Sequence, residues 1–139
     1  MGKTALFADQ SPALSLSLAG HHFFLEVART PEALRRGLMN RKTLPLQTGM
    51  LFLFPNPDRY CFWMKNTLVP LDLLFLDSGG SLSGMISGMQ PHSLKPRCAS
   101  NPVNMAIEVP SGTIKKFGLQ LGMKVTGLEA LYKEKEYVP

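Results

Sequence analysis

Apolar and polar residues alternate in several short segments of this chain, which is the pattern of half-buried β-strands. The alternation is clearest at residues 13–18 (ALSLSL), and it resumes at residues 23–28 (FFLEVA). The intervening AGHH can form a turn, so the two segments predict a β-hairpin.

Six further segments predict strands. Residues 49–55 (GMLFLFP) are apolar on both faces, which is typical of a central strand. The others are YCFWMK at 60–65, LDLLFLD at 71–77, LSGMISGM at 82–89, VNMAIEVP at 103–110 and MKVTGLEAL at 123–131. Residues 56–59 (NPDR) predict a turn, and residues 90–102, which contain three prolines, predict a long loop.

Two short helices are expected among these strands. In TPEALRRGLMNR, Thr30 can cap the first turn and Pro31 suits the first helical position. Gly37 falls inside this predicted helix, where it would allow another backbone to approach closely. A second short helix is expected within residues 111–122. Strands and helices do not alternate regularly, so a parallel α/β sheet is not predicted.

These elements predict a mainly-β fold, a compact single-domain barrel or sandwich of about seven to eight short strands. The domain is expected to cover residues 13–131. Residues 1–12 are expected to be disordered or derived from expression, and residues 132–139 to form a solvated tail.

Composition limits the class of protein. The chain has 139 residues, of which 45% are hydrophobic and 18% charged, so it is globular and fits one domain. No apolar run approaches the ~20 residues of a membrane span. The net charge of +5 makes the protein basic, but its basic residues are scattered, so the nucleic-acid signal is not strong.

The two cysteines, Cys61 and Cys98, are not part of a CxxC pair, so no zinc or redox site is predicted. Two unpaired buried thiols are the favoured interpretation, and a disulfide outside the cytoplasm is the alternative. No metal site or cofactor is predicted.

The segment CFWMKNTLVPLD (61–72) contains the most unusual combination of side chains. It places Trp63, the only tryptophan, beside Lys65, and sets Asp72 among leucines. Alternation from Tyr60 puts Cys61, Trp63 and Lys65 on one face. If the strands before and after NTLVP pair with each other, Lys65 and Asp72 come close together.

Such a pair has a structural interpretation and a functional one. Asp72 could accept hydrogen bonds from Lys65 or from backbone amides of the link, or the group could form the mouth of a small-ligand site. The candidate ligand-binding residues are Trp63, Lys65, Asn66, Thr67, Asp72, Arg41 and His92. Glu108 shares a face with Ala106 and is expected to point inward and pair with an arginine, as part of the architecture.

Four stretches resemble a known family when taken in order: VARTPEALRRGLMNRKTLP, GMLFLF, FWMKNTLVPLDLLFLDSGG and AIEVPSGTIKKFGLQLG. Over about residues 14–128 the chain resembles domain of unknown function 192, an uncharacterised, mostly prokaryotic family. The resemblance implies a single mainly-β domain that is often exported behind a signal peptide. The family's signature positions correspond here to Gly37, Leu38, Met39, Arg41, Gly49, Met50, residues 62–67, Pro70, Leu71 and Asp72.

The sequence is therefore consistent with three functions. The first is an extracytoplasmic binding or accessory module for a small polar or glycan-like ligand, or for a protein partner. The second is a hydrolase or lyase in which Asp72 or His92 acts as acid or base and Lys65 steadies negative charge. The third is nonspecific nucleic-acid binding. The expected location is the periplasm or the cell exterior after loss of a signal peptide, with the cytoplasm as the alternative.

Overall fold

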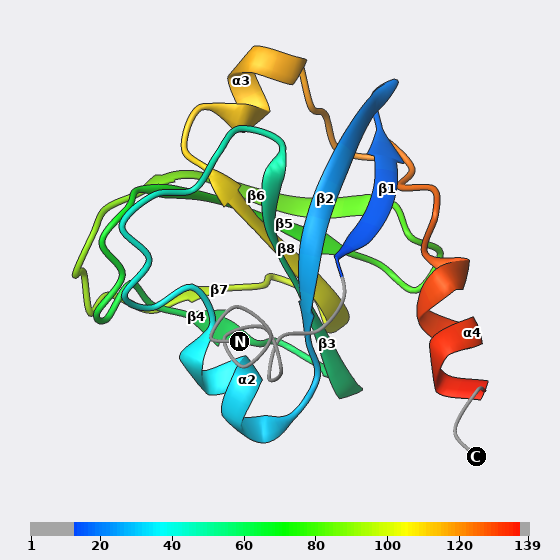
Figure 1. The fold of residues 1–139 in the computed structure, drawn as a ribbon, viewed down its shortest axis with the longest axis horizontal. Coiled ribbons are helices and arrows are strands. Elements are labelled where there is room, and N and C mark those ends of the chain that lie inside the picture. The colour runs from blue at the N-terminus through cyan, green and yellow to red at the C-terminus, as the bar shows by residue number, and fades with distance from the viewer. Residues whose placement is uncertain (1–12, 137–139) are drawn as a thin grey trace, which may run out of the picture.

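The computed structural model of the protein describes residues 13–136, which contain eight strands in two sheets and three short helices (Figure 1). This confirms the mainly-β prediction. The predictions for residues 1–12 and for the last three residues lie outside the described residues. No helix in the described part of the chain is long and apolar enough to cross a bilayer.

The main sheet has six strands in the spatial order β1-β2-β3-β8-β5-β6. Their bounds are Leu14–Leu18 (β1), His21–Ala28 (β2), Thr48–Asp58 (β3), Leu71–Leu76 (β5), Leu82–Met89 (β6) and Val103–Pro110 (β8). A second, two-stranded sheet pairs β4 (Cys61–Phe62) with β7 (Arg97–Cys98). The turn of the first hairpin lies at Ala19 and Gly20, so both histidines predicted to lie in the turn belong to β2.

One pair of neighbouring strands is parallel, which the sequence did not predict. β2 and β3 run in the same direction, and their connection contains α2 (Pro31–Arg36). The Thr30 side chain caps this helix by accepting a hydrogen bond from the Ala33 amide at 3.1 Å, as expected. Gly37 lies after the helix and not within it, at a φ of 50°, and a Cβ there would lie 3.2 Å from the Phe52 ring. The close neighbour is therefore an aromatic ring instead of another backbone.

The sheet is not closed into a barrel, but one segment connects its two edges. The amide of Val125 donates to the Gly80 carbonyl at 2.8 Å, just before β6, and Thr126 exchanges two hydrogen bonds with Ser17 of β1. The strand predicted at 123–131 is therefore reduced to isolated bridges. The helix α4 (Glu129–Glu136) follows, and it includes part of the predicted tail.

Each face of the main sheet has its own hydrophobic core, because side chains alternate along the central strands. On one face, Leu74 and Ile107 pack under the helix α3 (Thr113–Phe117) and the segment that leads to α4. On the other face, Leu73 and Ala106 pack under the chain that follows α2 and under the small β4–β7 sheet. The strand β5, which lies between β8 and the edge strand β6, is consequently buried along its whole length.

Asp72 is the one charged residue of β5, and its side chain is 0% exposed. Its carboxyl group accepts three backbone hydrogen bonds, from Gly88 at 2.9 Å, Gly112 at 3.1 Å and Ile114 at 2.9 Å. These donors belong to β6 and to the first turn of α3. Asp72 thus fixes three segments against one another.

The small sheet is covalently closed by a disulfide between Cys61 and Cys98, which are register partners. Both residues are exposed, so the favoured prediction of two unpaired buried thiols is wrong. The strand predicted at 60–65 is correspondingly short, because residues after Phe62 leave the sheet.

We predict that Asp72→Ala lowers the free energy of unfolding by about 3–5 kcal/mol, because three amides lose a charged acceptor in a buried setting. Asp72→Asn should lose less, since it keeps one acceptor oxygen. Urea denaturation measures both. Asp58→Ala is the matched control, because the exposed Asp58 accepts, within the described part of the chain, only from the neighbouring Arg59 amide. Equal stability losses for Asp58→Ala and Asp72→Ala would contradict this role for Asp72.

Candidate functional site

A cavity of about 170 Å³ lies between the α2 segment, the central strands and the small β4–β7 sheet. Five of its lining side chains, Leu34, Leu38, Phe52, Phe54 and Phe62, also belong to the hydrophobic core on this face of the sheet. The lining residues are Leu34, Arg35, Arg36, Gly37, Leu38, Met39, Phe52, Phe54, Cys61, Phe62, Trp63, Thr67 and Glu108. Six of these, at 37–39, 62–63 and 67, are positions that carry the family resemblance.

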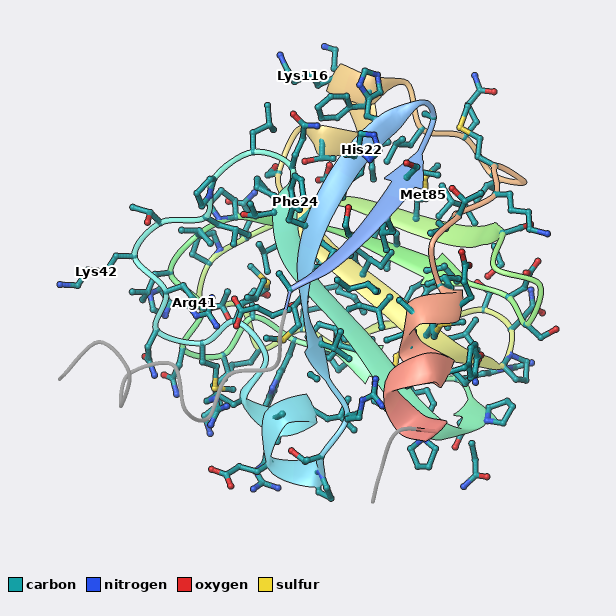
Figure 2. All side chains as sticks on the ribbon, turned by 45° about the vertical axis from the view of Figure 1, so that its right-hand side comes forward. His22, Phe24, Arg41, Lys42, Met85 and Lys116 are labelled. Atoms are coloured by element: carbon teal, nitrogen blue, oxygen red, sulfur yellow. A yellow bond between two sulfur atoms is a disulfide. The ribbon has the colours of Figure 1, made fainter. Side chains whose placement is uncertain are left out.

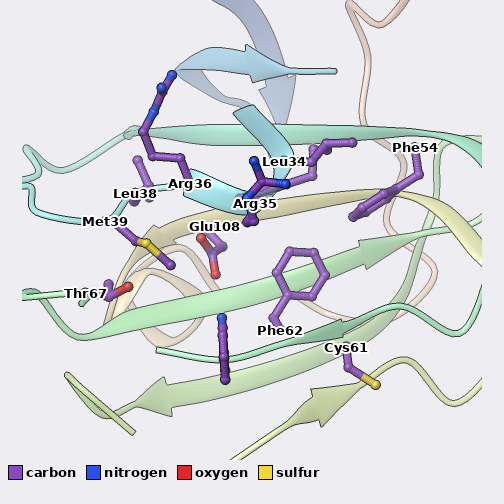
Figure 3. Close-up of a pocket in the computed structure, with 13 residues that line it drawn as sticks. Leu34, Arg35, Arg36, Leu38, Met39, Phe54, Cys61, Phe62, Thr67 and Glu108 are labelled. Atoms are coloured by element: carbon purple, nitrogen blue, oxygen red, sulfur yellow. The ribbon is translucent and has the colours of Figure 1, made fainter. Parts of the chain in front are cut away.

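Glu108 is the only carboxylic acid among the described residues of the lining. In β8 it lies between Met50 of β3 and Leu73 of β5, in the middle of the sheet, and its side chain points into the cavity (Figure 3). The residue is only 4% exposed. Its carboxyl group forms no hydrogen bond or ion pair with any residue that the structure describes, so the predicted pairing with an arginine is not found.

Burial without a partner changes the acid–base chemistry of this group. Desolvation disfavours the charged carboxylate and raises the pKa of Glu108 to about 8. At neutral pH the acid is therefore mainly protonated. In that form it can both donate and accept a hydrogen bond.

The position of Glu108 depends on a glycine in the neighbouring strand. A Cβ at Gly49 would lie 2.0 Å from the Glu108 carbonyl oxygen, a distance that no side chain can tolerate. Gly49 therefore allows β3 and β8 to pair at this point, which holds the backbone of Glu108 in register.

Trp63 lies at the rim of the cavity and is 47% exposed. Alternation still holds from Cys61 to Lys65, as predicted, although only two of these residues form a strand. Phe62 and Met64 are buried, while Cys61, Trp63 and Lys65 are exposed. The Lys65 ammonium group is 5.3 Å from the centre of the Trp63 ring, within the range of a cation–π contact.

Hydrogen bonds to backbone carbonyl groups hold the polar link after Trp63 (residues 65–67) in place. Thr67 is buried, and its hydroxyl donates to the Lys65 carbonyl at 3.1 Å. Asn66 adopts a left-handed φ of 53°, and its carbonyl accepts from the Asn40 amide at 2.8 Å. The His92 amide donates to the Thr67 carbonyl at 3.1 Å. These contacts fix the rim of the cavity against two other loops.

The structure separates the sequence candidates into two groups. Trp63 and Thr67 line the cavity, and Lys65 contacts Trp63. Asp72 is on the opposite face of the sheet from Glu108, since it is paired with Val109 instead. The predicted pairing of the two strands around NTLVP is wrong, because β4 pairs with β7 and β5 with β6 and β8.

Arg41 and His92 are also not part of the cavity lining. Arg41 forms a bidentate ion pair with Glu26, at 2.7 and 2.8 Å, which raises the pKa of Arg41 above its usual value. It lies in the connection between α2 and β3, next to the outward-pointing Lys42 (Figure 2). His92 is exposed. Within residues 13–136, no three His, Cys, Asp or Glu side chains gather as a metal site.

Sequence reasoning missed the role of Glu108 and of the α2 segment in this site. The available signal was an acidic residue between Ile107 and Val109, on the inward face of a strand. That signal indicates burial, but it does not reveal that the facing segment leaves a cavity there. Arg35 and Arg36, which are among the scattered basic residues of the chain, also line the cavity.

Comparison with known proteins gives a consistent family and no established activity. Residues 14–127 match the profile of domain of unknown function 192, described as "Uncharacterized ACR". No curated protein matches the chain significantly.

Two crystal structures of similar proteins share the fold. One, described as "a putative transcription regulator" from Sinorhizobium meliloti 1021, has a TM-score of 0.81 and 32% identity, covering 84% of this chain and 95% of that one. The other, a protein of unknown function from Novosphingobium aromaticivorans DSM 12444, has a TM-score of 0.79 and 29% identity, covering 88% and 95%.

We predict that the contribution of Glu108 to the stability of this protein falls as pH rises from about 4.5 to about 8. The unfolded chain ionises Glu108 near 4.5, whereas the folded protein keeps the proton until its pKa of about 8. The free energy of unfolding therefore decreases across this interval. The decrease is about 1.4 kcal/mol per pKa unit, a few kcal/mol in total.

Urea denaturation at pH 4.5, 6, 7 and 8.5 measures this effect, with Glu108→Gln as the matched control. The glutamine cannot ionise, so the difference in stability between variant and wild type should grow in favour of the variant as pH rises. A constant difference across the series would show that Glu108 titrates normally.

Proposed function

The chain belongs to the domain of unknown function 192 family, and we propose that it acts as a binding domain for a small polar ligand of about the size of one ring. The binding site is the cavity between α2 and the β4–β7 sheet. The observation that carries this proposal is Glu108, a buried acid that points into the cavity with no partner among the described residues. A buried polar group normally has a hydrogen-bond partner, and a ligand would supply one here.

The size of the cavity limits the ligand. A cavity of about 150 Å³ in another protein accommodates benzene, so about 170 Å³ suits a single ring or a group of similar size. Pockets for drug-sized ligands are larger, from roughly 300 Å³. The ligand is therefore a small molecule or the terminal unit of a larger one, such as one sugar ring of a glycan.

Trp63 supplies the second recognition element. An exposed indole at the rim offers a flat apolar surface on which a ring can stack, and Lys65 adds a positive charge next to it. Apolar walls with one or two polar groups are typical of small-ligand sites. This combination favours binding over the hydrolase or lyase hypothesis, because the Asp72 carboxyl group is occupied by three amides on the other face of the sheet.

The disulfide supports an extracytoplasmic location for this module. Exposed disulfides persist mainly in oxidising compartments, such as the periplasm or the cell exterior. Cys61 also lines the cavity, so the same bond fixes one wall of the site.

We expect small ring compounds to change the fluorescence of this protein, because Trp63 is its only tryptophan. The probes are glucose, glucuronate, benzyl alcohol and benzoate, titrated to millimolar concentration. Calorimetry then compares any probe that binds with wild type, Trp63→Ala and Phe24→Ala. The alanine at position 63 should weaken binding about tenfold through the lost stacking surface.

Phe24→Ala is the control because Phe24 is an aromatic residue of similar exposure on β2, outside the cavity lining. It should leave affinity unchanged. The proposal fails if none of the four probes binds, or if the two alanine variants bind a probe equally well.

A further inference from the structure

Resting on the proposed function, we propose that the cavity selects a small organic monocarboxylate, held by Arg35 at its mouth and by the carboxyl group of Glu108 on its floor. The ligand class is thus a ring-sized anion such as a sugar acid or an aromatic acid. Three features of the site support this choice: the charges at the mouth, the state of the acid on the floor, and the apolar side chains of the walls.

Among residues 13–136, three positively charged side chains lie at the mouth or beside it. Arg35 and Arg36 come from α2, and Lys65 comes from the link after β4. Arg36 lies 3.6 Å from Glu32 in the exposed face of the helix, and Figure 3 shows its guanidinium directed away from Glu108. Arg35 forms no ion pair with any residue in the described part of the chain.

Glu108 suits an anion only while it is protonated. A neutral carboxylic acid donates its proton to a carboxylate oxygen of the ligand in a hydrogen bond that the ligand's charge strengthens. An ionised Glu108 would instead repel the ligand. The pKa of about 8 keeps the donor form present at neutral pH. A cationic ligand would be repelled by the three positive side chains at the mouth, and the neutral acid on the floor would offer it no negative charge.

The apolar walls set the rest of the ligand. Phe52, Phe62 and Leu38 line the same cavity as Glu108, so a ligand there also contacts carbon. A ring that carries one carboxylate can contact the apolar walls with its ring and contact Arg35 and Glu108 with its carboxylate. The sugar and aromatic probes of the experiment distinguish a hydroxylated ring from an aromatic one.

The experiment compares matched probes that differ mainly in charge. Calorimetry at pH 7 measures glucuronate against glucose, and benzoate against benzyl alcohol, with benzylamine as the cationic probe. In the pair that binds, we expect the carboxylate to bind at least tenfold more tightly than its neutral partner, and benzylamine to bind more weakly than both.

Two charge-matched variants assign the anion contact. Arg35→Gln should weaken carboxylate binding about tenfold and leave the neutral partner unchanged. Lys116→Gln removes the same charge on α3, at the opposite end of the molecule from α2 (Figure 2), and should change neither. Both positions are exposed, so the two variants should fold normally.

A pH series assigns the role of Glu108. The dissociation constant of the carboxylate should rise about tenfold between pH 7 and pH 9 in the wild type, because the free protein loses the Glu108 proton near pH 8. In Glu108→Gln the side chain keeps a donor and cannot ionise, so its affinity should stay constant. Lys65 is present in both proteins, so any effect of its ammonium group appears in both series.

The outcomes separate this inference from the proposed function. Equal or tighter binding of the neutral partner or of benzylamine overturns the inference and leaves the binding function in place. Equal effects of Arg35→Gln and Lys116→Gln, or the same pH dependence in wild type and Glu108→Gln, overturn it as well. If no probe binds at all, the proposed function falls and the inference falls with it.

Discussion

The three backbone hydrogen bonds to the buried Asp72 carboxyl group hold the centre of this fold together. They tie β5 to β6 and to the first turn of α3, at a point where the strand is covered on both faces. A carboxyl group in that setting is tolerated only because its oxygens are occupied by donors. With β5 fixed, its neighbour β8 is also fixed, and so is the side chain that β8 directs to the other face.

That second side chain is Glu108, and the contrast between the two acids explains why one is structural and the other is available. Val109 pairs with Asp72, and Glu108 pairs with Leu73, so consecutive residues of β8 serve opposite faces. The face of Asp72 closes around it with amides. The face of Glu108 is covered by α2 and the disulfide-linked β4–β7 sheet, which leave a cavity in front of the acid. Burial therefore raises the pKa of Glu108. A ligand that accepts a hydrogen bond from the protonated acid would offset the cost of burying it.

Much of the fold could be predicted from local pattern. VNMAIEVP is a strand from its first residue to its last, and the capping of α2 by Thr30 follows from TPEA alone. Local pattern could not show which strands pair. Because β4 joins β7, across 37 residues, instead of folding back on β5, the predicted proximity of Lys65 and Asp72 does not occur. Strand pairing at this distance depends on tertiary contacts that alternation does not encode.

Local pattern also predicted only part of the candidate site. Trp63 and Thr67 stood out because a polar link in an apolar strand is unusual, and both do line the cavity. Glu108 did not stand out, because an inward-facing acid most often has a partner. The parallel pairing of β2 with β3 moves α2 over the sheet and forms the cavity wall, and no residue of α2 signals that placement.

The central claim is that Glu108, which has no partner among residues 13–136, is a protonated acid that faces the cavity. Carbon-13 NMR of the glutamate side-chain carboxyl groups, titrated from pH 3 to pH 10 and assigned with Glu108→Gln, measures it most directly. The account predicts one carboxyl resonance that titrates near pH 8 and is absent from the variant. A Glu108 resonance that titrates near 4.5, like an ordinary glutamate, would contradict it.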